Sequence, residues 1–154
     1  MKSPILSDLH KTATVSPPPN EAFEMFTRQI SAWWPLATHS VGMEQSTGVE
    51  IEPWVGGRIV ETIAVGSNSI WGTVEAWDPP KRLRFTWHPG TATAEATRVE
   101  VKFREAGSGT IVELIHSGWD TRSDGAAARA HYDPGWDFVF GLYVEAGAGQ
   151  LEKG

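Results

Sequence analysis

The amino-acid sequence predicts an α+β fold in which an antiparallel sheet packs against a long C-terminal helix. Three observations predict it. Over residues 48–119, hydrophobic and polar residues alternate with a period of two, which is typical of half-buried strands. Short turns rich in Gly, Pro, Asn and Asp separate these strands, and connections this short join antiparallel neighbours. Apolar residues with helical spacing precede and follow the strand region.

The N-terminal part of the chain reads as a strand followed by a helix. Residues 9–16 form the expected strand, which ends at the prolines 17–19. Asn20 stands where an N-cap residue is expected. Apolar residues then recur at helical spacing, which predicts one amphipathic helix over 20–31. The sequence Trp33-Trp34-Pro35 ends it, because proline disfavours helix at the residue before it.

Six further strands follow, and their alternation assigns two faces to the sheet. Leu83, Phe85 and Trp87 share an apolar face, whereas Arg82 and Arg84 point to the opposite, charged face. Turn signals separate the strands, as at Gly66-Ser67-Asn68. The expected strands are 48–53, 57–65, 70–77, 82–88, 97–105 and 110–117.

A second helix is predicted at the C-terminal end of the chain. Asp133 is expected to cap it, Pro134 fits its first position, and residues 124–130 read as a short helical lead-in. Its apolar residues are numerous, so the helix is expected to be covered over most of its circumference. The main stripe is Trp136, Val139, Phe140 and Tyr143, widened by Phe138, Leu142 and Val144.

Length and composition restrict the class of protein. The 154 residues fit one domain, 1–154, with a core over about 9–150. The chain contains no cysteine, which excludes disulfides, thiolate nucleophiles and Cys-ligated metals. A net charge of −6 argues against a nucleic-acid partner. No apolar run is long enough for a signal peptide or a transmembrane helix, so we expect a cytoplasmic protein without a membrane partner.

Several segments resemble one known family. The resemblance covers residues 9–150 and is carried by Val15-Ser-Pro-Pro-Pro-Asn-Glu-Ala-Phe, Trp33-Trp34-Pro35, Val55-Gly-Gly-Arg, Trp71-Gly-Thr-Val, Trp77-Asp-Pro-Pro-Lys-Arg-Leu-Arg-Phe-Thr-Trp, Gly109-Thr-Ile-Val-Glu-Leu-Ile-His-Ser-Gly-Trp and His131-Tyr-Asp-Pro-Gly-Trp. Together they look like the bacterial branch related to the activator of the heat-shock-protein-90 ATPase, within the START-like (SRPBCC) superfamily. The resemblance implies a helix-grip fold, in which a curved antiparallel sheet wraps around the last helix and leaves a cavity. Members of the superfamily typically bind apolar or amphipathic small molecules, and a minority are cyclases or hydrolases.

Tryptophan supplies eight of the sixteen aromatic residues, and its distribution favours a ligand cavity. Large apolar rings on the sheet and on the last helix face each other in this fold, and each indole offers one hydrogen-bond donor to a ligand. Trp33, Trp34 and His39 lie in or beside a long connection that resembles a lid. The expected ligand-binding residues are Trp33, Trp34, His39, Phe85, Trp87, Phe103, Leu114, His116, Trp119, Trp136, Phe140 and Tyr143.

His116 is the most informative polar residue, because alternation places it on the apolar face of its strand. It is either a hydrogen-bonding or proton-transfer group in the pocket, or a structural histidine held by a backbone carbonyl. Histidine spacing matches no metal motif, and no nucleophile motif occurs, so we expect neither a metal nor a cofactor. The chain is therefore not expected to be an enzyme, and His116 is the one weak catalytic candidate.

The predicted function is that of a protein that holds an apolar or amphipathic small molecule between the sheet and the C-terminal helix. Two alternatives stay open. The charged sheet face is either simply solvated or a docking surface for a protein partner such as a chaperone, and it carries Arg82, Arg84, Arg98, Lys102 and Arg104. A small cyclase or hydrolase with His116 as general base is the other alternative. The sequence predicts no particular oligomeric state.

Overall fold

The computed structural model describes residues 6–64 and 67–153. Within them, seven strands form one antiparallel sheet in the order β1-β7-β6-β5-β4-β3-β2. The strands are β1 (Leu9–Val15), β2 (Ser46–Ile51), β3 (Arg58–Ile63), β4 (Ser67–Asp78), β5 (Arg82–Trp87), β6 (Thr97–Ala106) and β7 (Gly109–Ser117). The helices are α1 (Pro19–Phe26), α2 (Ile30–Trp33) and α3 (Gly125–Lys153), with short 3-10 turns η1 (Met43–Gln45), η3 (Thr93–Glu95) and η4 (Trp119–Thr121).

The predicted strands are confirmed, and their described ends lie within three residues of the expected ones. The register also confirms the assignment of faces, because Phe85 pairs with Val99 and Val99 pairs with His116, and all three are buried. The end of the strand expected over 57–65 and the turn at Gly66 lie partly outside the described residues.

The first helix differs from its prediction at both ends. It begins at Pro19, and no side chain caps it, so Asn20 is not the N-cap. Proline is suited to the first position because its fixed φ already matches a helix. The helix expected over 20–31 is also interrupted, because Thr27 closes α1: its backbone N–H and its hydroxyl both donate to the Phe23 carbonyl, at 3.0 and 2.7 Å.

The prediction that the C-terminal helix begins at Asp133 is wrong. α3 begins at Gly125 and continues through Pro134, so the expected lead-in is part of the same helix. Alanine-rich residues 126–130 have high helix propensity, which favours helix before the proline. The carboxylate of Asp133 pairs with Lys11 on β1 and caps nothing. Phe138 was expected to widen the buried stripe, but it is 52% exposed.

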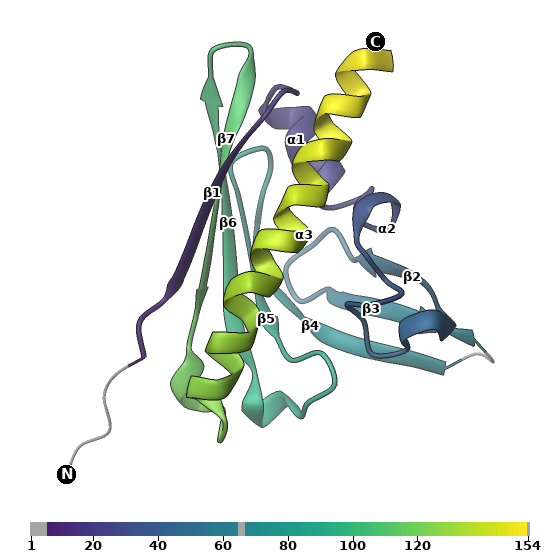
Figure 1. Ribbon diagram of the computed structural model, residues 1–154, viewed down its shortest axis with the longest axis vertical. Coiled ribbons are helices and arrows are strands. Elements are labelled where there is room, and N and C mark those ends of the chain that lie inside the picture. Colours follow the sequence, from purple (N-terminus) through teal and green to yellow (C-terminus); the bar gives the residue numbers. More distant parts are fainter. Residues whose placement is uncertain (1–5, 65–66, 154) are drawn as a thin grey trace.

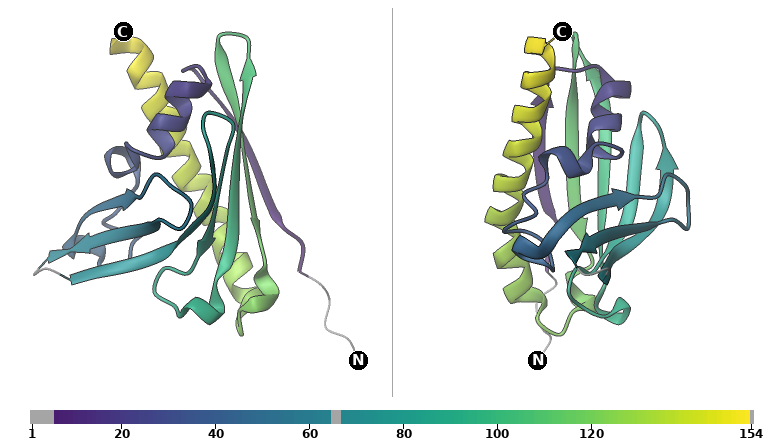
Figure 2. Two further views of the ribbon diagram at one scale, coloured as in Figure 1. Left: turned by 180° about the vertical axis from the view of Figure 1, so that it is seen from behind. Right: turned by 90° about the vertical axis from the view of Figure 1, so that its right-hand side faces the viewer.

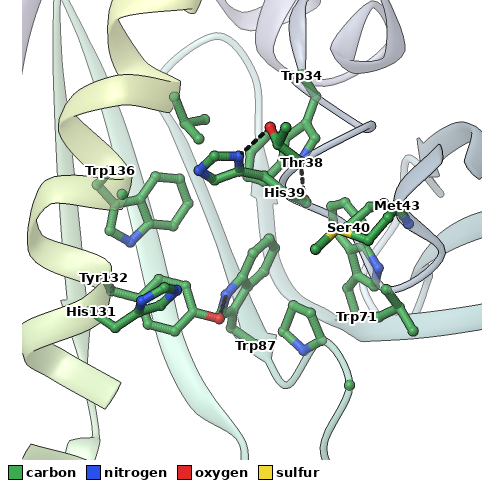
Figure 3. A pocket seen from close by; sticks show the side chains of 15 residues that line it. Trp34, Thr38, His39, Ser40, Met43, Trp71, Trp87, His131, Tyr132 and Trp136 are labelled. Carbon is green, nitrogen blue, oxygen red and sulfur yellow. Dashed lines mark hydrogen bonds between the residues drawn. The ribbon is translucent and has the colours of Figure 1, made fainter. Parts of the chain in front are cut away.

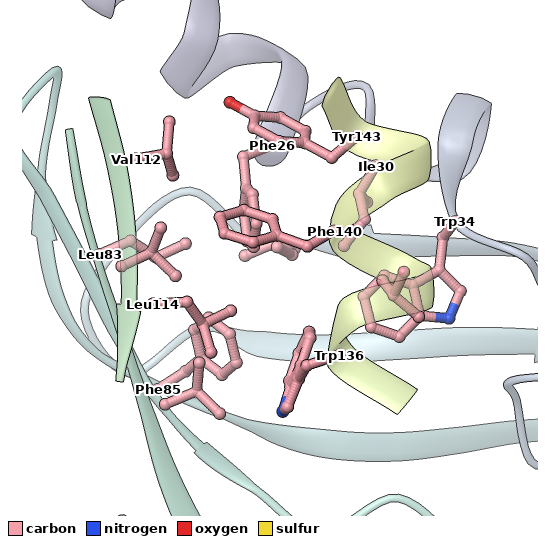
Figure 4. Packing of buried hydrophobic residues seen from close by; sticks show 14 of the residues in the cluster. Phe26, Ile30, Trp34, Leu83, Phe85, Val112, Leu114, Trp136, Phe140 and Tyr143 are labelled. Carbon is pink, nitrogen blue, oxygen red and sulfur yellow. The ribbon is translucent and has the colours of Figure 1, made fainter. Parts of the chain in front are cut away.

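α3 lies along the inside of the curled sheet, as the helix-grip fold requires (Figures 1 and 2). Figure 4 shows the core between them, where Phe85 and Leu114 from the sheet face Phe140 and Tyr143 from α3. The Tyr143 hydroxyl donates to the Ala22 carbonyl at 2.6 Å and so joins α3 to α1. No helix in the described part of the chain combines the length and the apolar character needed to cross a bilayer.

Candidate functional site

A cavity of about 530 Å³ lies between α3, strands β4 and β5, and the segment 34–43 that follows α2 (Figure 3). We call this cavity the aromatic pocket and the segment 34–43 the rim loop. The volume of the aromatic pocket falls within the usual range for small-molecule sites. The pocket is lined by Trp34, Thr38, His39, Ser40, Val41, Met43, Trp71, Trp87, Pro89, Gly90, His131, Tyr132, Gly135, Trp136 and Val139.

Four tryptophans from four different parts of the chain meet in this pocket. The ring of Trp34, in the rim loop, lies 5.4 Å from Trp71 on β4, 5.9 Å from Trp87 on β5 and 5.9 Å from Trp136 on α3. Trp87 and Trp136 are themselves 5.8 Å apart. These centroid distances are those of favourable tilted and edge-to-face ring pairs. The pocket walls are therefore mainly aromatic, and their rings pack against one another.

The indole N–H groups of these four tryptophans all donate within the protein. Trp34 donates to the His39 carbonyl at 2.8 Å, and Trp87 donates to the Tyr132 hydroxyl at 3.1 Å. Trp71 donates to the Glu61 carboxylate at 2.9 Å, and Trp136 donates to His116 at 2.9 Å. The sequence suggested that an indole would donate to a ligand, but here the rings offer their apolar faces instead.

Tyr132, His39 and His131 are among the polar residues that line the pocket. The Tyr132 hydroxyl accepts from Trp87, and no group in the described part of the chain accepts its proton. Burial raises the pKa of Tyr132 above its ordinary value, although the Trp87 hydrogen bond and the charge of Arg122 oppose this. The hydroxyl is therefore protonated near neutral pH and free to donate to an acceptor in the pocket.

His39 faces His131 across the pocket, from the rim loop toward α3 (Figure 3). Its Nδ1 lies 2.7 Å from the Thr38 hydroxyl, and its ring stacks on Phe138 with centroids 5.1 Å apart. Burial lowers the pKa of His39, and an electrostatic contribution from His131 lowers it further. His39 is therefore a neutral imidazole near neutral pH, with one ring nitrogen left for a ligand.

A buried carboxylate fixes the position of the rim loop. Glu61 on β3 is fully buried and accepts hydrogen bonds from the backbone N–H groups of Val41 at 2.9 Å and Gly42 at 3.0 Å. The Trp71 indole donates to the same side chain. Burial alone would raise the pKa of Glu61, but these hydrogen bonds outweigh it and lower the pKa. Glu61 thus links the loop to one aromatic wall, and sequence reasoning missed it.

His116 does not line the pocket. It is fully buried, Trp136 donates to its Nδ1, and its Nε2 lies 2.6 Å from the Thr97 hydroxyl. Burial lowers the pKa of His116 to about 3, and the charge of Arg122 contributes. Both ring nitrogens are therefore engaged within the core, with side-chain partners where the sequence suggested a backbone carbonyl or a ligand.

The structure brings four of the twelve expected ligand-binding residues to the pocket: Trp34, His39, Trp87 and Trp136. The other eight are buried in the core around it and do not line it: Trp33, Phe85, Phe103, Leu114, His116, Trp119, Phe140 and Tyr143. Sequence reasoning missed Trp71, His131 and Tyr132. Tyr132 lies four residues before Trp136, so a continuous helix would have placed both on one face.

The charged outer face of the sheet is largely neutralised by its own carboxylates. Glu75 pairs with Arg98 at 2.6 Å and with Arg84 at 3.3 Å. Glu100 pairs with Arg82 and lies 3.9 Å from Lys102. The face is therefore less basic than its arginine count suggested. Among the described residues, no group of three His, Asp or Glu side chains is placed to hold a metal ion.

Residues 16–140 match the model of the family described as Activator of Hsp90 ATPase homolog 1-like protein. A solved structure with 35% identity is an anthrahydroquino-γ-pyrone synthase, Txn09, complexed with SUM; the match covers 80% of this chain and 84% of that one, with a TM-score of 0.59. No curated protein matches the chain significantly.

Two further solved structures share the fold. The Aha1 dimer from Colwellia psychrerythraea has 16% identity and a TM-score of 0.67, and the match covers 92% of this chain and 96% of that one. Protein MLL2253 from Mesorhizobium loti has 20% identity and a TM-score of 0.64, with 90% and 94% covered. At these identities the likeness concerns the fold alone.

Proposed function

The chain belongs to the family of Activator of Hsp90 ATPase homolog 1-like proteins, and from this premise we propose that it binds an apolar or amphipathic small molecule in the aromatic pocket. Members of this fold bind small molecules or act as polyketide cyclases. The fold therefore does not decide which ligand is bound or whether a reaction is catalysed, and both must be argued from the site itself.

One observation carries the proposal: four tryptophans surround a cavity of about 530 Å³ while their indole N–H groups are satisfied inside the protein. A ligand therefore meets ring faces without having to replace any hydrogen bond of the walls. Flat aromatic surfaces pack best on such faces, which favours a planar, polycyclic ligand. Tyr132 and His39 offer hydrogen bonds to carbonyl or hydroxyl oxygens on its edge.

The relative with 35% identity supports the same ligand class, because it is an anthrahydroquino-γ-pyrone synthase. An anthrahydroquinone is planar and polycyclic, and it carries hydroxyl groups on its rings. The outer sheet face supports a protein-docking role less well, since Glu75 and Glu100 already pair with most of its cations.

Titration with a dihydroxyanthraquinone tests this proposal. Bound between the rings, the probe should quench tryptophan emission saturably with one site per chain and raise the melting temperature. Trp54, which is 53% exposed and lies outside the pocket, provides the control: Trp54→Phe should bind the probe as the wild type does. Quenching that never saturates, without a change in melting temperature, would contradict the proposal.

A second candidate function is a cyclase activity, which the synthase relative favours. Neutral His39 and the Tyr132 hydroxyl line the same pocket from the rim loop and from α3. His39 would take a proton from a carbon next to a ligand carbonyl, and the electron pair would move onto that carbonyl oxygen, held by Tyr132. The carbon would then bond to a second carbonyl carbon of the same molecule, and the imidazolium would return its proton to the new alkoxide.

This activity assigns the base to His39, since His116 has no free ring nitrogen. His39→Gln should then lower kcat for cyclisation of an aromatic diketone at least about a hundredfold, the usual contribution of a general base. His116→Gln should retain far more activity if it folds. Equal turnover by the wild type and His39→Gln would exclude this role for His39.

A further inference from the structure

A second, smaller cavity of about 240 Å³ adjoins the aromatic pocket. Pro89, His131 and Tyr132 line both cavities, so the two share a wall. The rest of its lining comes from Arg122 and Asp124, which follow η4, and from the first turns of α3. The small side chains of Ala127 and Ala128 leave the space open there. We call this cavity the arginine chamber.

Arg122 is held in place by part of its guanidinium group, and its Nη1 remains available as a donor. Its side chain is only 11% exposed, and its Nε and Nη2 donate to the two carboxylate oxygens of Asp124 at 2.7 and 2.9 Å. No partner in the described part of the chain bonds to its Nη1. A buried guanidinium with a fixed orientation and unused N–H groups is well suited to bind an oxygen acceptor.

Two carboxylates lie near Arg122, those of Asp124 and Glu95, and neither bonds to its Nη1. Asp124 offsets one charge, but its side chain is 52% exposed and therefore screened by water. The Glu95 carboxylate acts on Arg122 through its charge, but it does not line the chamber and accepts hydrogen bonds from the backbone N–H and the hydroxyl of Ser123. His131 and the Tyr132 hydroxyl supply further donors on the shared wall (Figure 3).

We propose that the arginine chamber recognises a carboxylate attached to the planar aromatic ligand, with Arg122 Nη1 as its principal donor. This inference rests on the proposed function, because the ring system must occupy the aromatic pocket for its substituent to reach past Tyr132. The ligand is then an aromatic carboxylic acid: its rings lie among the tryptophans and its anionic oxygens lie at Arg122.

Two probes of matched shape test the inference, namely an anthraquinone carboxylate and the corresponding carboxamide. The wild type should bind the carboxylate at least about tenfold more tightly, since a charge-assisted hydrogen bond exceeds a neutral one by about that factor. In Arg122→Met this preference should fall to within about twofold while carboxamide affinity is retained. Arg129→Met is the control, because Arg129 bonds to Ser7, before β1, and lines neither cavity.

A second variant tests the same site without removing a buried side chain. Asp124→Asn removes the competing negative charge but keeps an amide oxygen that can accept from the Arg122 Nε, so it should increase the preference for the carboxylate probe several-fold. Equal affinity of the wild type for the two probes, or an unchanged preference in Arg122→Met or Asp124→Asn, would overturn the inference. If neither probe binds the wild type, the proposed function itself fails.

Discussion

Trp136 on α3 donates its indole N–H to Nδ1 of His116 on β7, at 2.9 Å. An indole is a donor only, so Nδ1 carries no proton and Nε2 must carry it. The Nε2–H then donates to the Thr97 hydroxyl at 2.6 Å, and that hydroxyl donates to the Trp87 carbonyl at 3.1 Å. A chain of hydrogen bonds thus joins α3 to three neighbouring strands through a neutral histidine.

This arrangement predicts that His116 makes stability depend on pH. Its pKa is about 3 in the folded protein and 6.5 ordinarily, so between these values the unfolded chain binds the extra proton. The contribution of neutral His116 is intact above about pH 6.5 and is lost as the pH falls, by up to about 1.4 kcal/mol per pH unit. The free energy of unfolding, measured with urea between about pH 7 and pH 5, should therefore change less with pH in His116→Gln than in the wild type. The same dependence of unfolding free energy on pH in both proteins would contradict the burial of a neutral imidazole.

The hydrogen bonds of Glu61 predict that this residue positions the rim loop. Glu61→Gln should cost about 1–3 kcal/mol of stability, since two backbone N–H groups and one indole would share a single carbonyl oxygen. Amide exchange at Val41 and Gly42 should accelerate, and affinity for the dihydroxyanthraquinone should fall. Glu50→Gln, on the exposed side of β2, serves as the control. Unchanged exchange at both amides would contradict the positioning role.

The two tyrosines predict different consequences for the same substitution. Tyr132→Phe leaves the Trp87 indole without its acceptor and removes a donor from the pocket, so both stability and affinity for the anthraquinone probe should fall. Tyr143→Phe removes a hydrogen bond to Ala22 away from the pocket and should lower stability alone. Melting curves and probe titrations on both variants separate these effects. Equal affinity in the two variants would exclude Tyr132 as a ligand contact.

The lowered pKa of His39 predicts that ligand binding weakens in acid. Its pKa lies below the ordinary histidine value, so the ring is neutral at pH 7 and becomes charged as the pH falls through that lowered pKa. A charged ring beside His131 in a largely aromatic pocket disfavours an uncharged apolar ligand. Affinity for the carboxamide probe should therefore decrease on acidification, less so in His39→Asn. The same pH profile in both proteins would exclude His39 as the cause.

Much of the fold was predictable because its signals are local. Alternation along β5, where Leu83, Phe85 and Trp87 are buried, repeats in β6 and β7 and determines the faces of the sheet. The errors occurred where local signals compete. Pro134 reads as a helix start, yet the alanines before it and the Lys11–Asp133 pair accommodate a continuous helix.

The site was less predictable because it depends on how distant segments meet. Alternation predicted that His116 points inward. It could not predict that the Trp136 indole donates to His116 Nδ1, or that His116 does not line the pocket. Glu61 lies within a strand and has no motif, so only the fold shows that its carboxylate meets the rim loop. The distribution of the tryptophans along the chain favoured a ligand cavity, whereas only the packing shows that Trp71, and not Trp33, forms a wall of it.

Two glycines on α3 allow the central claim to be tested most directly. Gly135 lines the aromatic pocket and Gly141 does not, and a Cβ added at either position would meet nothing within 4 Å. Leucine at either position should not destabilise the helix, because glycine is a poor helix former. Calorimetric titration with the dihydroxyanthraquinone should show at least about tenfold weaker binding to Gly135→Leu, whose side chain displaces the ligand, and unchanged binding to Gly141→Leu. Wild-type affinity in a folded Gly135→Leu protein would contradict ligand binding in this pocket.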